Sequence, residues 1–285
     1  MRHPLLILGL AAGYHYGDVR PFLASLDACN STAQCVLFVT ATTRDTERMA
    51  AHGAHIVTCE KPHGRAHIPY NALRYFFYRH YLRTQAPPQT RVLLTDVRDV
   101  IFQTNPAAHP WPGDLAVTLE DKRMTIGTCP YMTRWVAGHL GDDAWQALRH
   151  KPISCSGTTV GTAAAMLRYL DLLCSHLEPF TPGDHMAGYD QGVHNHLLHQ
   201  GLLAPCGNVA VMDNTGPILT LGYREGEPEC DAHGVVHGDG PTPPVMVHQY
   251  DRKPELFRAI RQRHAQQQAK KPKPRKPYGR PVPIP

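Results

Sequence analysis

The N-terminal part of the chain alternates between short apolar runs and amphipathic segments, and this order constrains the fold more than any other feature of the sequence. The apolar runs predict strands at residues 4–12, 35–41, 55–60 and 92–95. Between them, the spacing of apolar residues predicts a helix that starts near Pro21 and further helices at 44–53 and 69–83. This β-α-β-α-β order is typical of a parallel, doubly wound α/β sheet.

The second half of the chain is less regular. Its pattern predicts a strand at 114–120, helices at 135–150, 163–177 and 190–201, and short strands between turns at 207–248. We therefore expect a mostly parallel central sheet flanked by helices, with a smaller mixed C-terminal half. The 285-residue chain divides into a folded domain, residues 1–264, and a basic Pro-rich tail, residues 265–285, whose composition predicts disorder.

The formal net charge of +5 is concentrated in that tail. Residues 270–280 hold six Lys and Arg and no acidic residue, so the rest of the chain is close to neutral. A folded body without a basic excess is not expected to bind nucleic acid. Two interpretations of the tail stay open: a solvated chain end, or an electrostatic contact with an anionic membrane leaflet.

Two further features bear on the cellular compartment. The apolar stretch LLILGLAAG, residues 5–13, is too short for a membrane span and has no small-residue cleavage site after a proper hydrophobic region. The eight cysteines show neither a CxxC pattern nor close Cys/His spacing, which predicts free thiols in a reducing compartment. We therefore expect a cytoplasmic protein, with the tail as a candidate peripheral contact at the inner face of the membrane.

The strand that ends at Asp96 is followed by a second aspartate, Asp99, in the sequence DVRD. Buried carboxylates are costly unless they are paired, hydrogen-bonded or bound to metal. Ligands of open α/β sheets bind beyond the carboxyl ends of the strands, and two carboxylates there suit a hard divalent ion that also bridges phosphates. The alternative is structural, with Asp99 paired to Arg98 or capping a turn.

The segment CSGTTVGT, residues 155–162, predicts a loop of small residues ahead of a long helix. Such a loop lets a ligand approach the backbone and offers N–H groups at a helix N-terminus. A plain helix N-cap at Thr159 or Thr162 explains the same residues equally well.

Two later segments carry further candidates. Asp190 and Gln191 open a predicted helix, where the aspartate can also be an ordinary N-cap. In the same helix, His194 and His196 are two residues apart and cannot face one ligand, so they are not expected to bind metal. His248 follows an apolar run, where a neutral imidazole can complete an Asp/Asp/His metal set, although a lone His is more often a surface or core residue.

Taken in order, these features resemble the GT-A glycosyltransferases. The Asp-Gln-plus-Asn segment and the late His with its Arg-Lys-Pro ending are most similar to the glycogenin-type branch, which uses nucleotide sugars. The resemblance covers roughly residues 4–256 and implies a GT-A type, Rossmann-like fold. It implies transfer of a sugar from a nucleotide sugar, with a UDP-linked donor, to a hydroxyl of a glycan or lipid-linked acceptor, with Mn²⁺ or Mg²⁺ as cofactor.

The resemblance also implies roles for individual residues around the metal and the nucleotide. Asp96, Asp99 and His248 would hold the metal, with Asp96 alternatively at the ribose. Because the chain has DVRD where the family has DxD, it stays open which aspartate touches the metal directly. The base and ribose would be lined by Ala12, Gly13 and Tyr14.

The remaining implied roles concern the phosphates and the sugar. Arg74 would reach the diphosphate, and Lys253 would close over its developing charge. Ser156 and Gly157 would lie near the donor sugar. Asp190 and Gln191 would be catalytic: Asp190 is the candidate base if the reaction inverts, and either residue would steady an oxocarbenium-like sugar if it retains, as the resemblance favours.

Two other classes of function remain as alternatives. A nucleotidyltransferase that makes sugar nucleotides should have a Gly-rich loop with a basic residue after the first strand, whereas GYHYGDVR offers only Arg20, late in the segment. A non-catalytic scaffold that binds carbohydrate or nucleotide would tolerate the loss of Asp99 and His248.

Overall fold

The structure is a computed structural model that describes residues 4–86 and 90–265. Its main feature is a seven-stranded sheet in the order β3-β2-β1-β4-β7-β6-β8. These strands are β1 (Leu5–Leu10), β2 (Gln34–Val39), β3 (His55–Thr58), β4 (Arg91–Thr95), β6 (Leu115–Leu119), β7 (Ser154–Thr162) and β8 (Val209–Met212). A second sheet of three short strands has the order β5-β10-β9, formed by Val100–Phe102, Met246–His248 and Ile218–Thr220.

Most neighbours in the central sheet are parallel. β1 pairs in parallel with β2 and β4, β2 with β3, and β6 with β8. β7 is the exception, because it runs antiparallel to both β4 and β6. The prediction of a mostly parallel α/β sheet is therefore confirmed, and the arrangement is compatible with a Rossmann-like fold.

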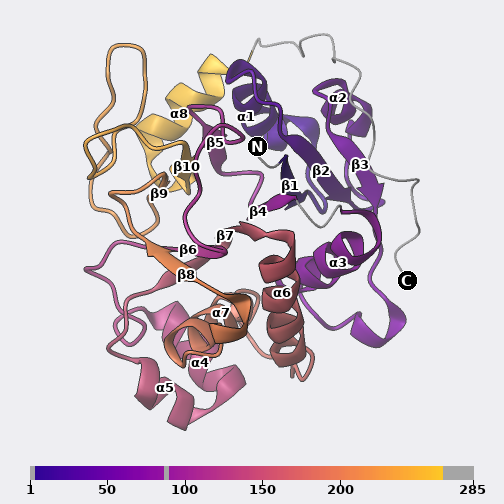
Figure 1. Ribbon diagram of the computed structural model, residues 1–285, viewed down its shortest axis with the longest axis vertical. Helices are drawn as coiled ribbons and strands as arrows, with labels where there is room; N and C mark the ends of the chain where they lie inside the picture. The colour runs from indigo at the N-terminus through magenta and orange to yellow at the C-terminus, as the bar shows by residue number, and fades with distance from the viewer. Residues whose placement is uncertain (1–3, 87–89, 266–285) are drawn as a thin grey trace.

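Helices cover both faces of this sheet. They are α1 (Tyr16–Ala28), α2 (Thr46–Ala51), α3 (Tyr70–Gln85), α4 (Pro130–Leu140), α5 (Asp142–Leu148), α6 (Ala163–Leu177), α7 (Tyr189–His199) and α8 (Pro254–Arg263). Figure 1 shows α1 and α2 at the end of the molecule that carries β2 and β3, and α4, α5 and α7 gathered at the opposite end next to β8.

The alternation of side chains along β1 links the two layers. Leu6 and Leu8 join the core shared with α3 and α6, whereas Leu5 and Ile7 join the core shared with α1. Successive side chains of a strand point to opposite faces, so a fully apolar strand is expected in a sheet covered on both sides.

Three predicted elements were wrong in detail. The expected loop at 155–162 is strand β7, in which all of Ser154–Gly161 is buried. The small and β-branched residues of this segment fit between two neighbouring strands, which a count of apolar residues does not reveal. Thr162 is the N-cap of α6, as its alternative interpretation stated. The helix expected at 135–150 is instead α4 and α5, separated at Gly141, whose φ of +88° favours glycine.

The helix expected to start near Pro21 begins earlier, at Tyr16. The His15 side chain accepts from the Gly17 N–H, and the Asp18 side chain accepts from the His15 N–H, so the first turn is capped. Pro21 lacks an N–H for the Gly17 carbonyl one turn back. Arg261 of α8 supplies that hydrogen bond instead, with an Nη1–O distance of 2.7 Å.

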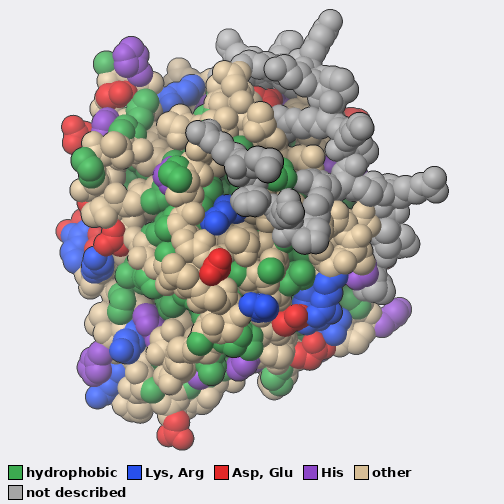
Figure 2. Space-filling view, in the orientation of Figure 1, with side chains coloured by type: hydrophobic (Ala, Val, Ile, Leu, Met, Phe, Trp, Pro, Cys, Tyr) green, Lys and Arg blue, Asp and Glu red, His purple; other side chains and the backbone are tan. Residues whose placement is uncertain are grey.

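Charged side chains are mixed over the surface. Figure 2 shows Lys and Arg interspersed with Asp and Glu on the described part of the face in view. Among the described residues, no helix is both long and apolar enough to cross a bilayer. The predicted tail lies outside the described residues from 266 onward.

Candidate metal and ligand site

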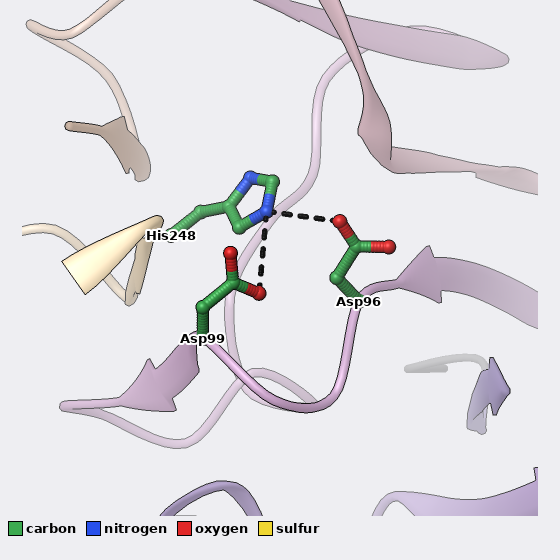
Figure 3. A group of neighbouring side chains, drawn as sticks. All are labelled: Asp96, Asp99 and His248. Carbon is green, nitrogen blue, oxygen red and sulfur yellow. Dashed lines mark hydrogen bonds and ion pairs between the residues drawn. The ribbon is translucent and has the colours of Figure 1, made fainter. Parts of the chain in front are cut away.

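Asp96, Asp99 and His248 lie together at the carboxyl end of β4. His248 Nε2 is 3.2 Å from Asp96 Oδ2 and 3.8 Å from Asp99 Oδ1. One ligand atom from each of the three side chains falls within a 4.8 Å span. Figure 3 shows both carboxylates turned toward the same nitrogen of the imidazole. The spacing allows a single metal ion to be held between them.

Strand pairing explains how residues so far apart in sequence meet. The chain leaves the central sheet after β4, turns through residues 96–99 and enters the small sheet as β5. There Val100 lies opposite His248 of β10 in an antiparallel pair. Asp99 directly precedes Val100, where the chain enters β5, and its Oδ1 lies 3.8 Å from Nε2 of the imidazole. The Asp96 N–H donates to the Gly157 carbonyl of β7 at 2.9 Å, which fixes the other end of the turn.

Gly157 makes room for this group. A Cβ atom at this position would lie 2.6 Å from Asp96 Oδ2 and 2.6 Å from His248 Cε1. Any other residue would therefore displace the two side chains or the strand. The close approach of the β7 backbone leaves space for the carboxylate and the imidazole but none for a further side chain, as expected of a ligand-binding position.

The charges of the three side chains are coupled. Burial raises the pKa of Asp99 to about 6, with His248 opposing the shift and Asp96 adding to it. Burial also acts to raise the pKa of Asp96, but the Arg74 charge and the His248 contacts outweigh it and hold this pKa below its usual value. Burial acts to lower the pKa of His248, whereas Cys155 and the aspartates raise it overall. Because the pKa of His248 is raised, a cation that binds here must displace the proton of the imidazole.

Asp99 does not pair with Arg98, which was the structural alternative to metal binding. The Arg98 guanidinium lies 2.5 Å from Asp251 Oδ2, whereas Asp99 forms its ion pair with His248. His248 Nδ1 faces the Cys155 thiol at 3.5 Å, which leaves Nε2 for the carboxylates. An Asp/Asp/His set of oxygen and nitrogen donors fits a divalent metal ion.

A buried network joins this group to α7. The Arg74 guanidinium of α3 pairs with Asp96 on one side and lies 3.3 Å from Asp190 Oδ2 on the other. The same Asp190 oxygen accepts from Ser156 Oγ at 3.1 Å. Tyr75 OH lies within hydrogen-bond distance of the Ser156 carbonyl and of Asp190. Asp190 is therefore a buried, partnered carboxylate rather than the N-cap of α7, which is Gly188.

Burial raises the pKa of Asp190, while the positive charge of Arg74 opposes the shift. The neighbouring histidine, His194, bonds to Ser154 Oγ and Tyr169 OH, and burial lowers its pKa to about 3. Both its ring nitrogens have protein partners, so it offers none to a metal.

Asn195 binds both the N–H and the carbonyl of Ser154, the first residue of β7. These two hydrogen bonds hold α7 against the start of that strand.

These groups open into a cavity of about 650 Å³, a volume in the range of small-molecule sites. Ten of the residues predicted from sequence line it: Ala12, Tyr14, Arg74, Asp96, Asp99, Ser156, Gly157, Asp190, Gln191 and His248. They come from the ends of β1, β4 and β10, from β7, and from the first turns of α3 and α7. The carboxyl edge of the sheet thus collects the predicted residues, as expected for an open α/β fold.

Two predicted residues do not line the cavity. Gly13 lies between two that do, in a turn with φ of +73°, and its N–H donates to Thr40 Oγ1 at 3.2 Å. Its role is to turn the backbone after β1. Lys253 is buried, and its ammonium group donates to the Arg224 carbonyl. This contact holds the segment before α8, and the structure does not bring Lys253 to the phosphate position that the resemblance implied.

Sequence reasoning missed Glu120, which lines the same cavity and is only 2% exposed. It follows β6 at the same edge of the sheet at which Asp96 follows β4. Its Oε1 accepts from Gln191 Nε2 at 3.3 Å, and burial raises its pKa. The signal was present, because Glu120 ends the predicted strand 114–120 and a second acidic residue, Asp121, follows it directly. Tyr131 and Trp135 of α4 and Arg98 also line the cavity and were not singled out.

No protein-family model matches the chain, and no curated protein matches its sequence.

Proposed function

We propose that the protein is a metal-dependent glycosyltransferase that moves a sugar from a nucleotide sugar, with a UDP-linked donor, to a hydroxyl of a glycan or lipid-linked acceptor. One observation carries the proposal. Asp96, Asp99 and His248 gather at the carboxyl edge of a mostly parallel sheet, inside a cavity that Arg74, Asp190 and Gln191 also line. The GT-A type of fold and the kinship to the glycogenin-type branch belong to this proposal.

The metal ion, Mn²⁺ or Mg²⁺, would be held by Asp96, Asp99 and His248. When bound, it supplies neutralisation of the charge that develops on the departing diphosphate. Arg98 and Arg252 line the cavity as well. Their guanidinium groups are suited to phosphate oxygens, a role that the sequence suggested for Arg252 as well as for Lys253.

The network around Arg74 positions the carboxylates. By pairing with both Asp96 and Asp190, Arg74 favours the ionised form of each carboxyl and holds the two about one cation. Asp96 can then face the metal and the nucleotide, while Asp190 presents negative charge to the donor sugar. Tyr14 and Ala12, after β1, would line the nucleotide.

The roles of Asp190 and Gln191 follow from their surroundings. Asp190 Oδ2 already contacts Arg74, Tyr75 and Ser156. Three protein groups thus occupy this oxygen, so it is not free to take a proton from an acceptor hydroxyl, which favours stabilisation of an oxocarbenium-like sugar over base catalysis. Gln191 would hold the sugar on the same side through its amide. We therefore propose a retaining reaction.

The experiment is a thermal-shift screen of UDP-, GDP- and CMP-sugars, with and without Mn²⁺. A ligand at 100 times its Kd stabilises a fold by about 2.7 kcal/mol. We expect stabilisation by the UDP-sugars that requires Mn²⁺ and is lost in Asp99→Asn and His248→Ala. Stabilisation that persists in both variants would instead indicate a binding scaffold, and no stabilisation by any of the nucleotides would contradict the proposal.

The proposed cytoplasmic location, with the tail at the inner face of a membrane, rests on the sequence alone.

A further inference from the structure

An aromatic pair lies at the rim of the cavity. Among the described residues, four large apolar side chains are exposed, and of these Tyr131 alone lines the cavity, with 56% of its surface accessible. Trp135 follows one helical turn later on α4 and lines the cavity too. The two ring centroids are 5.9 Å apart, with 35° between the ring planes. Single exposed apolar residues need no explanation, but a pair at a cavity rim does.

Trp135 is held rigidly in place. Its Nε1 donates to the His185 carbonyl at 2.9 Å. Its ring lies so close to α7 that a Cβ at Gly188 would be 2.3 Å from Trp135 Cζ2. The buried face of the same helix, α4, carries Met132 and Val136, which are fully buried. Trp135 therefore supports Tyr131 as a preformed aromatic surface, and such a surface loses little conformational entropy when it binds a ligand.

Contacts connect this pair to the polar interior. Gln191 lies in the first turn of α7, between the two glycines, Gly188 and Gly192, that pack against Trp135. Its Nε2 lies 3.6 Å from Met132 Sδ, next to Tyr131, and 3.3 Å from Glu120 Oε1. Gln191 therefore stands between the aromatic pair and the Glu120 carboxylate.

Glu120 has an unused hydrogen-bonding atom. Its Oε2 is buried and makes no hydrogen bond of normal geometry within the described part of the chain, although the Gln249 and Cys155 side chains also face this carboxylate. A buried acceptor without a partner is costly, and a hydroxyl group brought by a ligand would satisfy it. An anionic ligand would be repelled at the same place. The aromatic rim and the free carboxylate oxygen together select a neutral molecule with an apolar face and hydroxyl groups.

We propose that Tyr131 and Trp135 form the acceptor subsite, and that the acceptor is a neutral glycoside. One face of its pyranose ring packs on Tyr131 and Trp135, because the C–H groups of that face are apolar. Its hydroxyl groups point inward to Gln191 and Glu120. This inference rests on the proposed function in naming the ligand an acceptor, but the sugar site itself can be tested without any transfer reaction.

The test is binding of methyl glycosides, measured by saturation-transfer difference NMR. The probes are methyl β-glucoside, methyl β-galactoside and methyl α-mannoside, each titrated with Mg²⁺ alone and with Mg²⁺ and UDP. We expect at least one to bind, and Tyr131→Ala to weaken it about tenfold, or about 1.4 kcal/mol. Tyr131→Phe should keep the affinity within about twofold, since it retains the aromatic face.

Val211→Ala is the matched control. Val211 is 53% exposed, like Tyr131, but does not line the cavity, so its loss should leave glycoside binding unchanged. Thermal unfolding of each variant checks that the fold is intact.

Equal affinity of Tyr131→Ala and the wild-type chain would overturn the subsite, as would binding of no probe in either condition. In that case Tyr131 belongs to some other surface, such as a contact with a protein. Mg²⁺-dependent UDP binding in the same samples reports separately on the proposed function. Glycoside binding that needs Tyr131 in a chain that does not bind UDP would support the sugar site and contradict the transferase.

Discussion

The inner and outer parts of the cavity are built in opposite ways. Inside, Arg74, Asp96 and Asp190 share ion pairs, and Asp190 is 3% exposed. At the rim, Tyr131 is 56% exposed and contacts mainly Trp135. Each inner residue stabilises the fold as well as the site, whereas the rim residue can be changed without leaving a buried charge. Stability and chemistry are therefore coupled inside the cavity and separable at its edge.

The largest effect should follow the loss of the inner cation. Arg74→Ala leaves Asp190 buried without its cation and removes one of the two partners of the half-buried Asp96. Breaking a buried ion pair in this way costs about 3–5 kcal/mol of the free energy of unfolding. Urea denaturation at neutral pH measures the change.

The control for this variant is Arg83→Ala on the same helix. Arg83 also pairs with an aspartate, Asp171, but both side chains are about half exposed, and such surface pairs contribute about 0–1 kcal/mol. If Arg74→Ala and Arg83→Ala lower the free energy of unfolding by the same amount, the contrast between inner and outer residues is wrong.

Metal binding should depend on ligand position rather than on overall negative charge. Asp99→Asn and His248→Ala are expected to weaken Mn²⁺ binding by about 100-fold or more, since loss of even a supporting residue around a metal typically costs 10–100-fold. Titration of free Mn²⁺ by electron paramagnetic resonance gives the affinities.

Asp251→Asn removes a charge that lines the same cavity but pairs with Arg98. Its effect on Mn²⁺ affinity should be within about threefold, which is under 1 kcal/mol. If Asp251→Asn lowered the Mn²⁺ affinity as much as Asp99→Asn, the cavity would attract the cation only through its overall negative charge and not through specific ligands.

The affinity for Mn²⁺ should rise with pH. The pKa of Asp99 is raised to about 6 and that of His248 is raised as well, so at pH 5 both groups hold protons that a cation must displace. Between pH 5 and pH 8 the dissociation constant should fall by about tenfold or more for each proton released. Calorimetry in buffers of different ionisation enthalpy counts those protons, and an affinity independent of pH would exclude Asp99 and His248 as ligands.

The smallest effect is expected at the rim. Tyr131→Ala should change the free energy of unfolding by no more than about 0.5 kcal/mol, the usual range for surface substitutions, and should leave Mn²⁺ affinity unchanged. The same denaturation and titration measurements apply. A loss of more than about 2 kcal/mol would show that the aromatic pair is part of the core after all.

Sequence patterns predicted the regular half of the molecule well. The apolar runs that became β1, β2 and β4 are nearly continuous, as expected of strands buried on both faces. β7 escaped prediction because its Ser, Gly and Thr residues are small rather than apolar, and its burial depends on the neighbours β4 and β6. Hydrophobic periodicity cannot register a strand whose place is set by close backbone packing.

The candidate site likewise contains residues that the sequence predicted and residues that only the fold revealed. Asp96, Asp99 and His248 could be proposed from their positions after apolar runs, but the β5–β10 pairing that brings them together is a long-range contact. Lys253 was expected at the phosphates, yet the segment after β10 turns it to the Arg224 carbonyl. Glu120 gave a local signal only as an acidic residue at the end of a strand, and Tyr131, near the start of a helix, gave none.

The pairing of β5 with β10 has a consequence for how the protein is made. Asp99 is translated well before its partner His248, which lies far downstream in the sequence. A nascent or prematurely truncated chain therefore has the two aspartates without the imidazole. The complete ligand set exists only after synthesis has passed β10, so unfinished products cannot form the full cation site.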